Sequence, residues 1–185
     1  MRRGLVNLTR GRLDPAPTMF EDITPDEIRE RIAACHVNVQ AMHDYWLTKR
    51  GSRAMPARAD IEPAEIKKLL PMMVLVDVTA DARRFVYRLV GTQEVAERGT
   101  DPTGKSIAEA FFGGSLEETL SCYDYVVRNR APFCYRDPYA AADGQVQSDD
   151  IIYLPLSDDG AGVNMVLVFT HCRTFWRRTK AGSLL

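Results

Sequence analysis

The sequence predicts an α+β fold in which a long N-terminal helix precedes a single antiparallel sheet. Three observations lead to this prediction. Apolar residues repeat at helical spacing over residues 28–46, alternation typical of strands begins near residue 72, and three further strand patterns follow residue 132. The chain of 185 residues is within the usual size range of one domain with a helical extension.

The composition is that of an ordinary globular protein, with 45% hydrophobic and 26% charged residues. A formal net charge of -1 supplies no attraction for nucleic acid. The N-terminal segment lacks the apolar core of a secretory signal, and no segment reaches the length of a membrane span. We therefore expect a cytoplasmic protein that binds neither nucleic acid nor a membrane.

The N-terminal part divides into an arm and a helix. Residues 1–23 carry two prolines, four arginines and little periodicity, which predicts a flexible arm. A helix over 24–51 follows, because Thr24 can cap it, a proline occupies its first position and Glu27 completes a capping box. Gly51 is well placed to end this helix.

A narrow apolar stripe runs along this predicted helix. Its members follow one another at spacings of four, three, four, three and four residues, which is a heptad pattern. Such a stripe suits packing on the chain's own sheet or on a second copy of the chain, and the sequence leaves both open. We expect a homodimer whose contact includes this dimer seam, which consists of Ile28, Ile32, Cys35, Val39, Met42 and Trp46.

The remaining helices are short, and each has a signal at one of its ends. Flanking prolines predict a helix over 64–70, and a glycine closes one over 92–98. A capping box at Ser106 starts a helical turn, and a box at Ser115 starts a longer helix that ends near residue 129.

Alternation predicts five strands, over residues 72–78, 85–90, 133–136, 149–156 and 163–171. Asp143-Gly144 and Asp159-Gly160 lie in the last two connections, as hairpin turns favour. The last strand is apolar on both alternating faces, which indicates a central strand that is covered on both sides. The short helices can cover one face only, so the N-terminal helix or a partner chain must cover the other.

Several short motifs accompany this order of elements. They are Tyr45-Trp46, Arg50-Gly51, Pro56-Ala57-Arg58-Ala59-Asp60-Ile61, Pro63-Ala64-Glu65-Ile66, Leu69-Leu70-Pro71, Asp77-Val78, Phe85-Val86-Tyr87-Arg88-Leu89-Val90-Gly91-Thr92 and Gly99-Thr100-Asp101-Pro102-Thr103-Gly104. With these motifs, residues 45–170 resemble a bacterial group of short, stand-alone PAS proteins. The resemblance implies a PAS-like five-stranded antiparallel sheet with short helices on one face. We place this domain at 52–172, and a basic C-terminal tail at 173–185.

The resemblance also implies a sensory or signalling module that has no output domain of its own and is not an enzyme. Such a module binds a small molecule, an unidentified signalling protein or both. Covalent flavin is disfavoured, because no Asn-Cys-Arg-Phe-Leu-Gln motif occurs. Haem is disfavoured too, because residues 115–130 hold no histidine that could be its axial ligand. The sequence leaves the identity of any other cofactor unknown.

We expect the ligand pocket between the inner face of the sheet and the helices. Strand alternation and helical spacing select its lining, which is Phe85, Tyr87, Leu89, Phe112, Leu120, Tyr123, Val127, Phe133, Tyr135 and Tyr153. Alternation places Arg88 on the opposite face from Tyr87. We expect Arg88 to be partly buried and paired with Asp77.

The other polar residues receive structural interpretations. Asp149 and Asp150 are adjacent on a strand, so they point to opposite faces and are predicted to be edge or solvent charges. Glu94 and Glu97 are predicted to be solvated. No catalytic residue and no metal site is assigned, and the widely spaced cysteines are predicted to be small buried hydrophobes, namely Cys35, Cys122, Cys134 and Cys172.

His36 and His43 lie seven residues apart and are interpreted as interface residues, with a metal site or a pH switch as the alternative. Two alternative functions are also open. One is a small cone-shaped, isomerase-like enzyme with a buried acid beside a tyrosine, for which Asp77 near Tyr87 is the candidate pair. The other is a dimerising adaptor whose pocket is filled by its own side chains.

Overall fold

The computed structural model describes residue 20 and residues 23–140 and 145–177. The predicted arm lies almost wholly outside these residues, as do the Asp143-Gly144 turn and residues 178–185 of the predicted tail. Residues 173–177 belong to the last strand, so the tail begins later than predicted. No helix in the described part of the chain is long and apolar enough to span a membrane.

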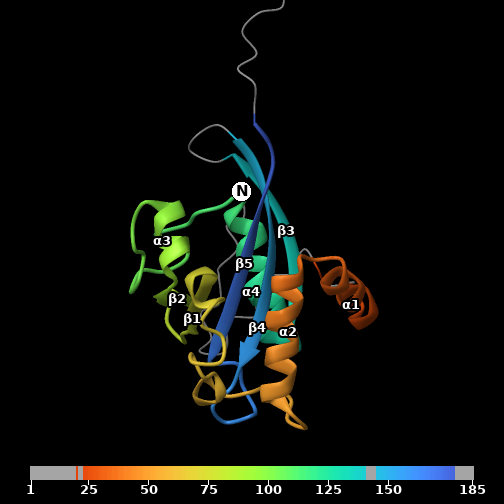
Figure 1. Ribbon diagram of the computed structural model, residues 1–185. Helices are drawn as coiled ribbons and strands as arrows, with labels where there is room; N and C mark the ends of the chain where they lie inside the picture. The colour runs from red at the N-terminus through yellow and green to blue at the C-terminus, as the bar shows by residue number, and fades with distance from the viewer. Residues whose placement is uncertain (1–19, 21–22, 141–144, 178–185) are drawn as a thin grey trace, which may run out of the picture.

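The structure is an α+β fold built on one five-stranded antiparallel sheet (Figure 1). The strands are β1 (Met73–Val78), β2 (Phe85–Val90), β3 (Phe133–Ala140), β4 (Gln145–Leu156) and β5 (Met165–Arg177). Their order across the sheet is β2-β1-β5-β4-β3, so β5 is central, as predicted. The last three strands are longer than predicted, and Gly160 adopts a positive φ of 72° in the turn between β4 and β5.

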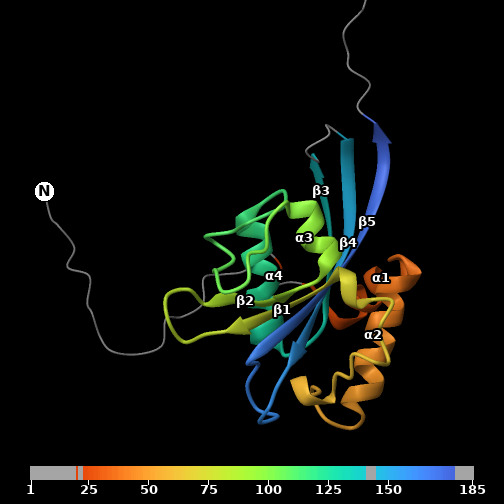
Figure 2. The same ribbon diagram turned by 60° about the vertical axis from the view of Figure 1, so that its left-hand side comes forward.

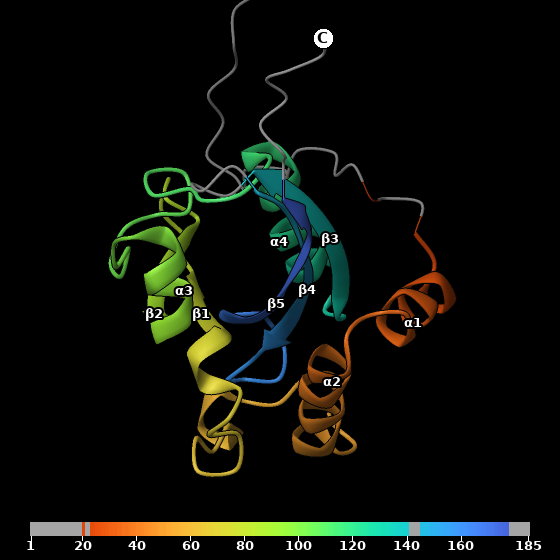
Figure 3. The ribbon, with the colours of Figure 1, turned by 45° about the horizontal axis from the view of Figure 1, so that its top comes forward.

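In the described part of the chain, four α-helices cover the two faces of this sheet. They are α1 (Pro25–Ala33), α2 (Val37–Arg50), α3 (Thr92–Arg98) and α4 (Leu116–Asn129). Figures 2 and 3 show α3 and α4 on one side of the β4–β5 ribbon and α1 and α2 on the other side. Every described residue of β5 from Met165 to Thr170 is buried, because both of its faces are covered.

The predicted capping signals are present. Thr24 and Glu27 form the reciprocal capping box of α1, and Ser115 accepts from the backbone N–H of Glu118 at the start of α4. Ser106 and Glu109 also bond reciprocally, but only a turn follows them. The predicted helix over 64–70 is wrong, because successive i→i+3 bonds make turns there and a 3₁₀ helix over Leu70–Met72.

The predicted continuous helix over 24–51 is interrupted at residues 34–36. The backbone N–H of His36 donates to Oδ2 of Asp150 at 2.7 Å, and Nδ1 of His36 accepts from the N–H of Asn38 at 3.2 Å. Asp150 is fully buried on β4, so its carboxylate must have donors around it. The bond to Asp150 takes the His36 N–H out of the helical pattern, and His36 caps α2 instead.

The six residues of the predicted dimer seam are all buried within this one chain. α1 packs on β3, and α2 packs on β4 and β5. Trp46 is 1% exposed, and its indole N–H donates to the carbonyl of Pro155 at 2.9 Å. The seam therefore forms part of the chain's own core, which is the intramolecular arrangement, and the prediction that it is a dimer contact is corrected. A homodimer through another surface stays a prediction.

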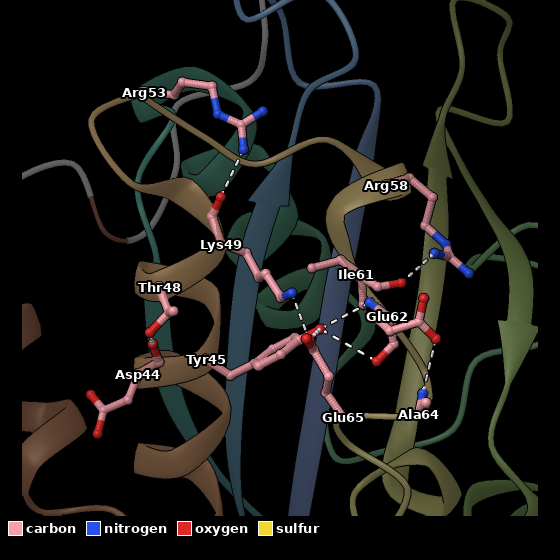
Figure 4. Close-up of polar contacts among 10 residues, drawn as sticks. All are labelled: Asp44, Tyr45, Thr48, Lys49, Arg53, Arg58, Ile61, Glu62, Ala64 and Glu65. Atoms are coloured by element: carbon pink, nitrogen blue, oxygen red, sulfur yellow. Dashed lines mark hydrogen bonds and ion pairs between the residues drawn. The ribbon is translucent and has the colours of Figure 1, made fainter.

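A polar network holds α2 against the segment that follows it (Figure 4). The Tyr45 hydroxyl accepts from the N–H of Glu62 and donates to Glu65, each at 2.9 Å. Lys49 forms an ion pair with Glu65 at 2.6 Å, which raises the pKa of Lys49 and lowers that of Glu65. Arg58 closes the turn of this segment by donating to the Ile61 carbonyl. These contacts fix the side of α2 that does not face the sheet.

A β-bulge interrupts the alternation of β2. Val76 pairs with Tyr87 and Leu75 pairs with Leu89, so Arg88 is an extra residue without a partner on β1. The bulge turns Leu89 outward, where it is 41% exposed, and this corrects its predicted place in the pocket. Arg88 does pair with Asp77, at 4.0 Å, but its side chain is 68% exposed and not partly buried as predicted.

Substitution of Arg88 by alanine should therefore leave stability almost unchanged. An exposed ion pair of this length contributes about 0–1 kcal/mol. We expect the midpoint of thermal unfolding to move by less than about 4 °C. A larger fall, measured by circular dichroism, would show that the pair with Asp77 carries more of the stability than its exposure allows.

Gly91 is required where α3 meets the 3₁₀ turn. A Cβ at this position would lie 2.4 Å from the carbonyl oxygen of Pro71 and 2.5 Å from that of Leu70, and neither backbone group can move away cheaply. Gly91→Ala should cost about 2 kcal/mol or more. Gly162→Ala is the matched control, because nothing lies within 4 Å of its Cβ position. Equal unfolding midpoints for the two variants would contradict this packing.

Candidate functional site

A small cavity of about 50 Å³ lies between the inner face of the sheet and the helices, where the pocket was predicted. Four of the ten predicted residues line it, namely Tyr87, Phe112, Tyr123 and Tyr153. A second cavity of about 40 Å³ adjoins it and shares Arg98, Phe112, Ile151 and Thr170 with the first. Together the two cavities make the candidate site.

The other predicted residues lie elsewhere. Phe85 is core and stacks on Tyr123 with 4.8 Å between ring centroids. Phe133 is fully buried against Tyr125, and Leu120 and Val127 are partly buried beside the same core. Tyr135 donates to Glu118 and lines a different cleft, next to α1. Six of the ten predicted residues therefore lie outside this cavity, and its use as a ligand pocket stays a prediction.

Arg98 is the main residue of this site that sequence reasoning missed. Its side chain is only 12% exposed, and its guanidinium lies over the rings of Tyr87 and Phe112 at 5.2 and 5.3 Å. Nη1 donates to the Tyr87 hydroxyl at 3.1 Å. Nε is buried, and within the described part of the chain it has no hydrogen-bond partner. Arg98 is therefore a largely buried cation, and one of its hydrogen-bond donors, the Nε–H, is unused within the described part of the chain.

Glu94 is the acid nearest to Arg98, and its predicted solvated position is wrong. It is 7% exposed, and Oε2 lies 3.4 Å from Nη2 of Arg98. Thr170 also hydrogen-bonds its carboxylate. Burial raises the pKa of Glu94, although Arg98 pulls it the other way. The ion pair between Glu94 and Arg98 is therefore weak. Glu97 is exposed, as predicted.

Aromatic rings form the apolar wall of the site. Tyr123 from α4 meets Tyr153 from β4 edge to face at 5.1 Å. Burial raises the pKa of Tyr123 well above its usual value, so its hydroxyl is un-ionised at neutral pH. Phe112 is 39% exposed on the loop before α4 and lines both cavities. A ligand would meet flat apolar surface on one side and the Arg98 guanidinium on the other.

The sequence did contain a signal for this pair. Glu94 and Arg98 are four residues apart, which is the spacing of an ion pair on a helix. Such pairs are usually exposed, and the helix is too short for its periodicity to show which side is buried. The close contact at Gly91 holds α3 against the 3₁₀ turn and thereby fixes the buried side.

The remaining polar candidates lie in several places. Asp149 and Asp150 are both buried, which corrects the prediction of edge or solvent charges, and Asp149 lines the second cavity of the candidate site. The ring of His36 stacks on that of His171 at 3.4 Å, whereas His43 lies beside Trp46, so the two predicted histidines do not meet. No cluster of three or more His, Cys, Asp or Glu side chains suited to a metal ion occurs among the described residues.

Comparison with known families identifies the fold. The PAS domain family matches residues 34–168, which is more than half of the chain. The chain therefore belongs to this family, as its sequence motifs predicted. The match begins at the break between α1 and α2, so it includes α2, which the predicted domain boundary at residue 52 had excluded. No match was found among curated proteins.

Several solved structures are similar to this chain. A light-oxygen-voltage domain studied with a flavin analogue is 10% identical, with a TM-score of 0.48 over 60% of this chain and 83% of that chain. The LOV domain of a blue-light activated histidine kinase from Erythrobacter litoralis is 11% identical, with a TM-score of 0.44 over 56% and 95%. A PAS domain of an HTR-like protein from Haloarcula marismortui is 15% identical, with a TM-score of 0.37 over 78% and 99%.

The raised pKa of Glu94 predicts a pH-dependent effect of Glu94→Gln. The folded state holds the Glu94 proton more tightly than the unfolded chain does, so folding loses stability as pH rises from the unfolded pKa through the folded one. The Glu94→Gln variant does not lose stability in this way, because glutamine does not titrate. Its unfolding midpoint, relative to wild type, should therefore rise between pH 4 and pH 7.

Glu97→Gln is the control for this measurement, because Glu97 is exposed on the same helix. Its midpoint relative to wild type should stay flat over the same pH range. If the Glu94→Gln difference instead fell with rising pH, the pairing with Arg98 would outweigh burial, and the electrostatic description of the site would be wrong.

Proposed function

We propose that this chain is a PAS sensory module whose pocket binds a small molecule through an anionic group, which Arg98 recognises. The observation that carries the proposal is the buried Nε of Arg98, which lacks a hydrogen-bond partner among the described residues. PAS domains typically bind ligands and mediate signalling, and the family assignment supports this general role. The buried guanidinium of Arg98 is the feature that favours an anionic group on the ligand.

The unused Nε–H of Arg98 is energetically unfavourable. A buried N–H without a partner costs about 1–3 kcal/mol. The contact of Arg98 with Glu94 at 3.4 Å is longer than the roughly 2.7–2.9 Å of a strong charge-assisted bond. Because Nε is buried, the Arg98 side chain must turn toward the cavity, and a carboxylate could then accept from two donors of the same guanidinium and satisfy Nε. Ligand binding would therefore remove a cost that the empty site carries.

The size of the site limits the ligand. A cavity of about 50 Å³ holds roughly three or four water-sized groups, which matches a carboxylate with one attached carbon. A larger ligand needs the site to open, and the exposed ring of Phe112 is the wall whose movement would join the two cavities to solvent. We propose that the signal is a change in this wall, which a protein partner reads.

The two alternative functions fit the site less well. The isomerase-like enzyme needs Asp77 beside Tyr87, but Asp77 pairs with Arg88 and Tyr87 bonds to Arg98. The ligand-free adaptor is favoured by the small volume of the cavities. It gives no reason, however, to bury an arginine with an unused donor. A homodimer, a cytoplasmic location and the signalling partner remain proposals that do not depend on the pocket.

The test measures thermal unfolding with acetate, succinate and phosphate as probes. A ligand at one hundred times its Kd stabilises by about 2.7 kcal/mol, which is roughly 5–10 °C for a chain of this size. We expect acetate or succinate to raise the midpoint of the wild type by this amount. We expect Arg98→Gln to abolish the rise.

Two controls separate binding from folding. Arg88→Gln removes an exposed arginine on β2 that lines neither cavity, and it should keep the full response. The double variant Glu94→Gln/Arg98→Gln removes both members of the buried ion pair, so it should fold and still fail to respond. An equal response in wild type and double variant would show that the anion binds elsewhere, and no response to any probe in the folded wild type would favour the adaptor.

A further inference from the structure

A second chemically distinctive place lies on the opposite side of the sheet from the Arg98 pocket. Cys35 follows α1, and Cys134 is on β3, 99 residues later in the chain. Their Sγ atoms are 2.7 Å apart, and both residues are buried. A cleft of about 240 Å³ beside them is lined by Arg31, Ala34, Cys35, Cys134, Tyr135 and Arg136.

We propose that Cys35 and Cys134 form a reversible disulfide when a peroxide enters this cleft, which makes the junction between α1 and α2 a redox-sensitive site. The proposal is independent of the Arg98 pocket. A disulfide needs its sulfurs about 2.05 Å apart, so the two Sγ atoms must approach by only about 0.7 Å.

Exposure assigns a role to each sulfur. Cys35 Sγ donates to the carbonyl of Arg31 at 3.2 Å, and between Cys35 and Cys134 either thiol can be the donor. The Cys35 sulfur and burial hold the pKa of Cys134 well above its usual range. Cys35 is the more exposed of the two, so it is the sulfur that attacks the oxidant.

The reaction balances with a peroxide as the oxidant. Cys35 gives up its proton and its sulfur attacks one peroxide oxygen, the O–O bond breaks, and the second oxygen leaves as water. The product is a sulfenic acid on Cys35. The Cys134 sulfur then attacks the Cys35 sulfur, the S–O bond breaks, and the hydroxyl leaves as water with the Cys134 proton. Two thiols and one hydrogen peroxide give one disulfide and two waters.

Burial selects the oxidant. Cys35 is 8% exposed and Cys134 is 3% exposed, so a bulky disulfide such as that of glutathione cannot reach either sulfur in line, whereas hydrogen peroxide fits the cleft. In a reducing compartment such a bond is transient, which is typical of a redox sensor. While it lasts, the bond adds a covalent link between the end of α1 and β3 to the packing, the His36–Asp150 hydrogen bond and the His36–His171 ring contact that already hold this junction.

The experiment treats the reduced full-length protein with hydrogen peroxide and then maps its thiols. We expect two of the four cysteines to become unreactive toward iodoacetamide after denaturation, and peptide mapping to find Cys35 joined to Cys134. Dithiothreitol should restore all four. Glutathione disulfide at the same concentration should leave the thiols free. Cys122→Ser is the matched control, because Cys122 is buried in α4, and it should form the same bond.

Two results would overturn the proposal. The first is recovery of both Cys35 and Cys134 as free thiols under conditions that oxidise another cysteine of the wild type. The second is a bond between two chains instead of within one. Hydrogen exchange over residues 25–36 tests whether the bond fixes α1 to β3. The exchange should slow at least tenfold in the oxidised wild type and stay unchanged in peroxide-treated Cys134→Ser. Equal exchange in oxidised and reduced wild type would refute the fixing of α1.

Discussion

The central strand β5 imposes the constraint on which the rest of the structure depends. It lies between β1 and β4, and its residues from Met165 to Phe169 are apolar on both faces. An antiparallel strand of this kind is stable only if both faces of the sheet are covered. α4 and the segment around α3 cover one face, and α2 covers the other. The two layers separate the two proposed sites, one on each side of the sheet.

The buried carboxylate of Asp150 organises the outer layer. It accepts from the backbone of His36 and from Nε of Arg136 at 2.9 Å, so it joins the start of α2 to β3 and β4. A buried charge is tolerated because these donors surround it. Its position also explains why the N-terminal helix is divided. The inner layer has a corresponding buried pair, Glu94 and Arg98, but this pair is less well satisfied.

Much of the fold was predictable from local patterns. The capping signals at Thr24 and Ser115, the glycine after Arg98 and the two-faced apolar pattern of β5 are each read from neighbouring residues, and the structure confirms them. The division at His36 was not predictable, because its cause is a residue 114 positions away. The bulge at Arg88 depends on the pairing of β2 with β1, which periodicity does not reveal. Alternation and helical spacing selected four of the residues that line the cavity, but the charged residues beside it resemble a surface pair in the sequence.

The unused Nε–H donor of Arg98 can be observed directly. In a nitrogen-15 spectrum of the arginine side chains, the Nε–H signal of Arg98 is assigned as the one that disappears in Arg98→Lys. The account predicts that this signal shifts on titration with acetate, to a plateau, while the Nε–H signal of Arg88 does not move. A signal for Arg98 that stays constant while acetate is raised to the millimolar range would contradict it.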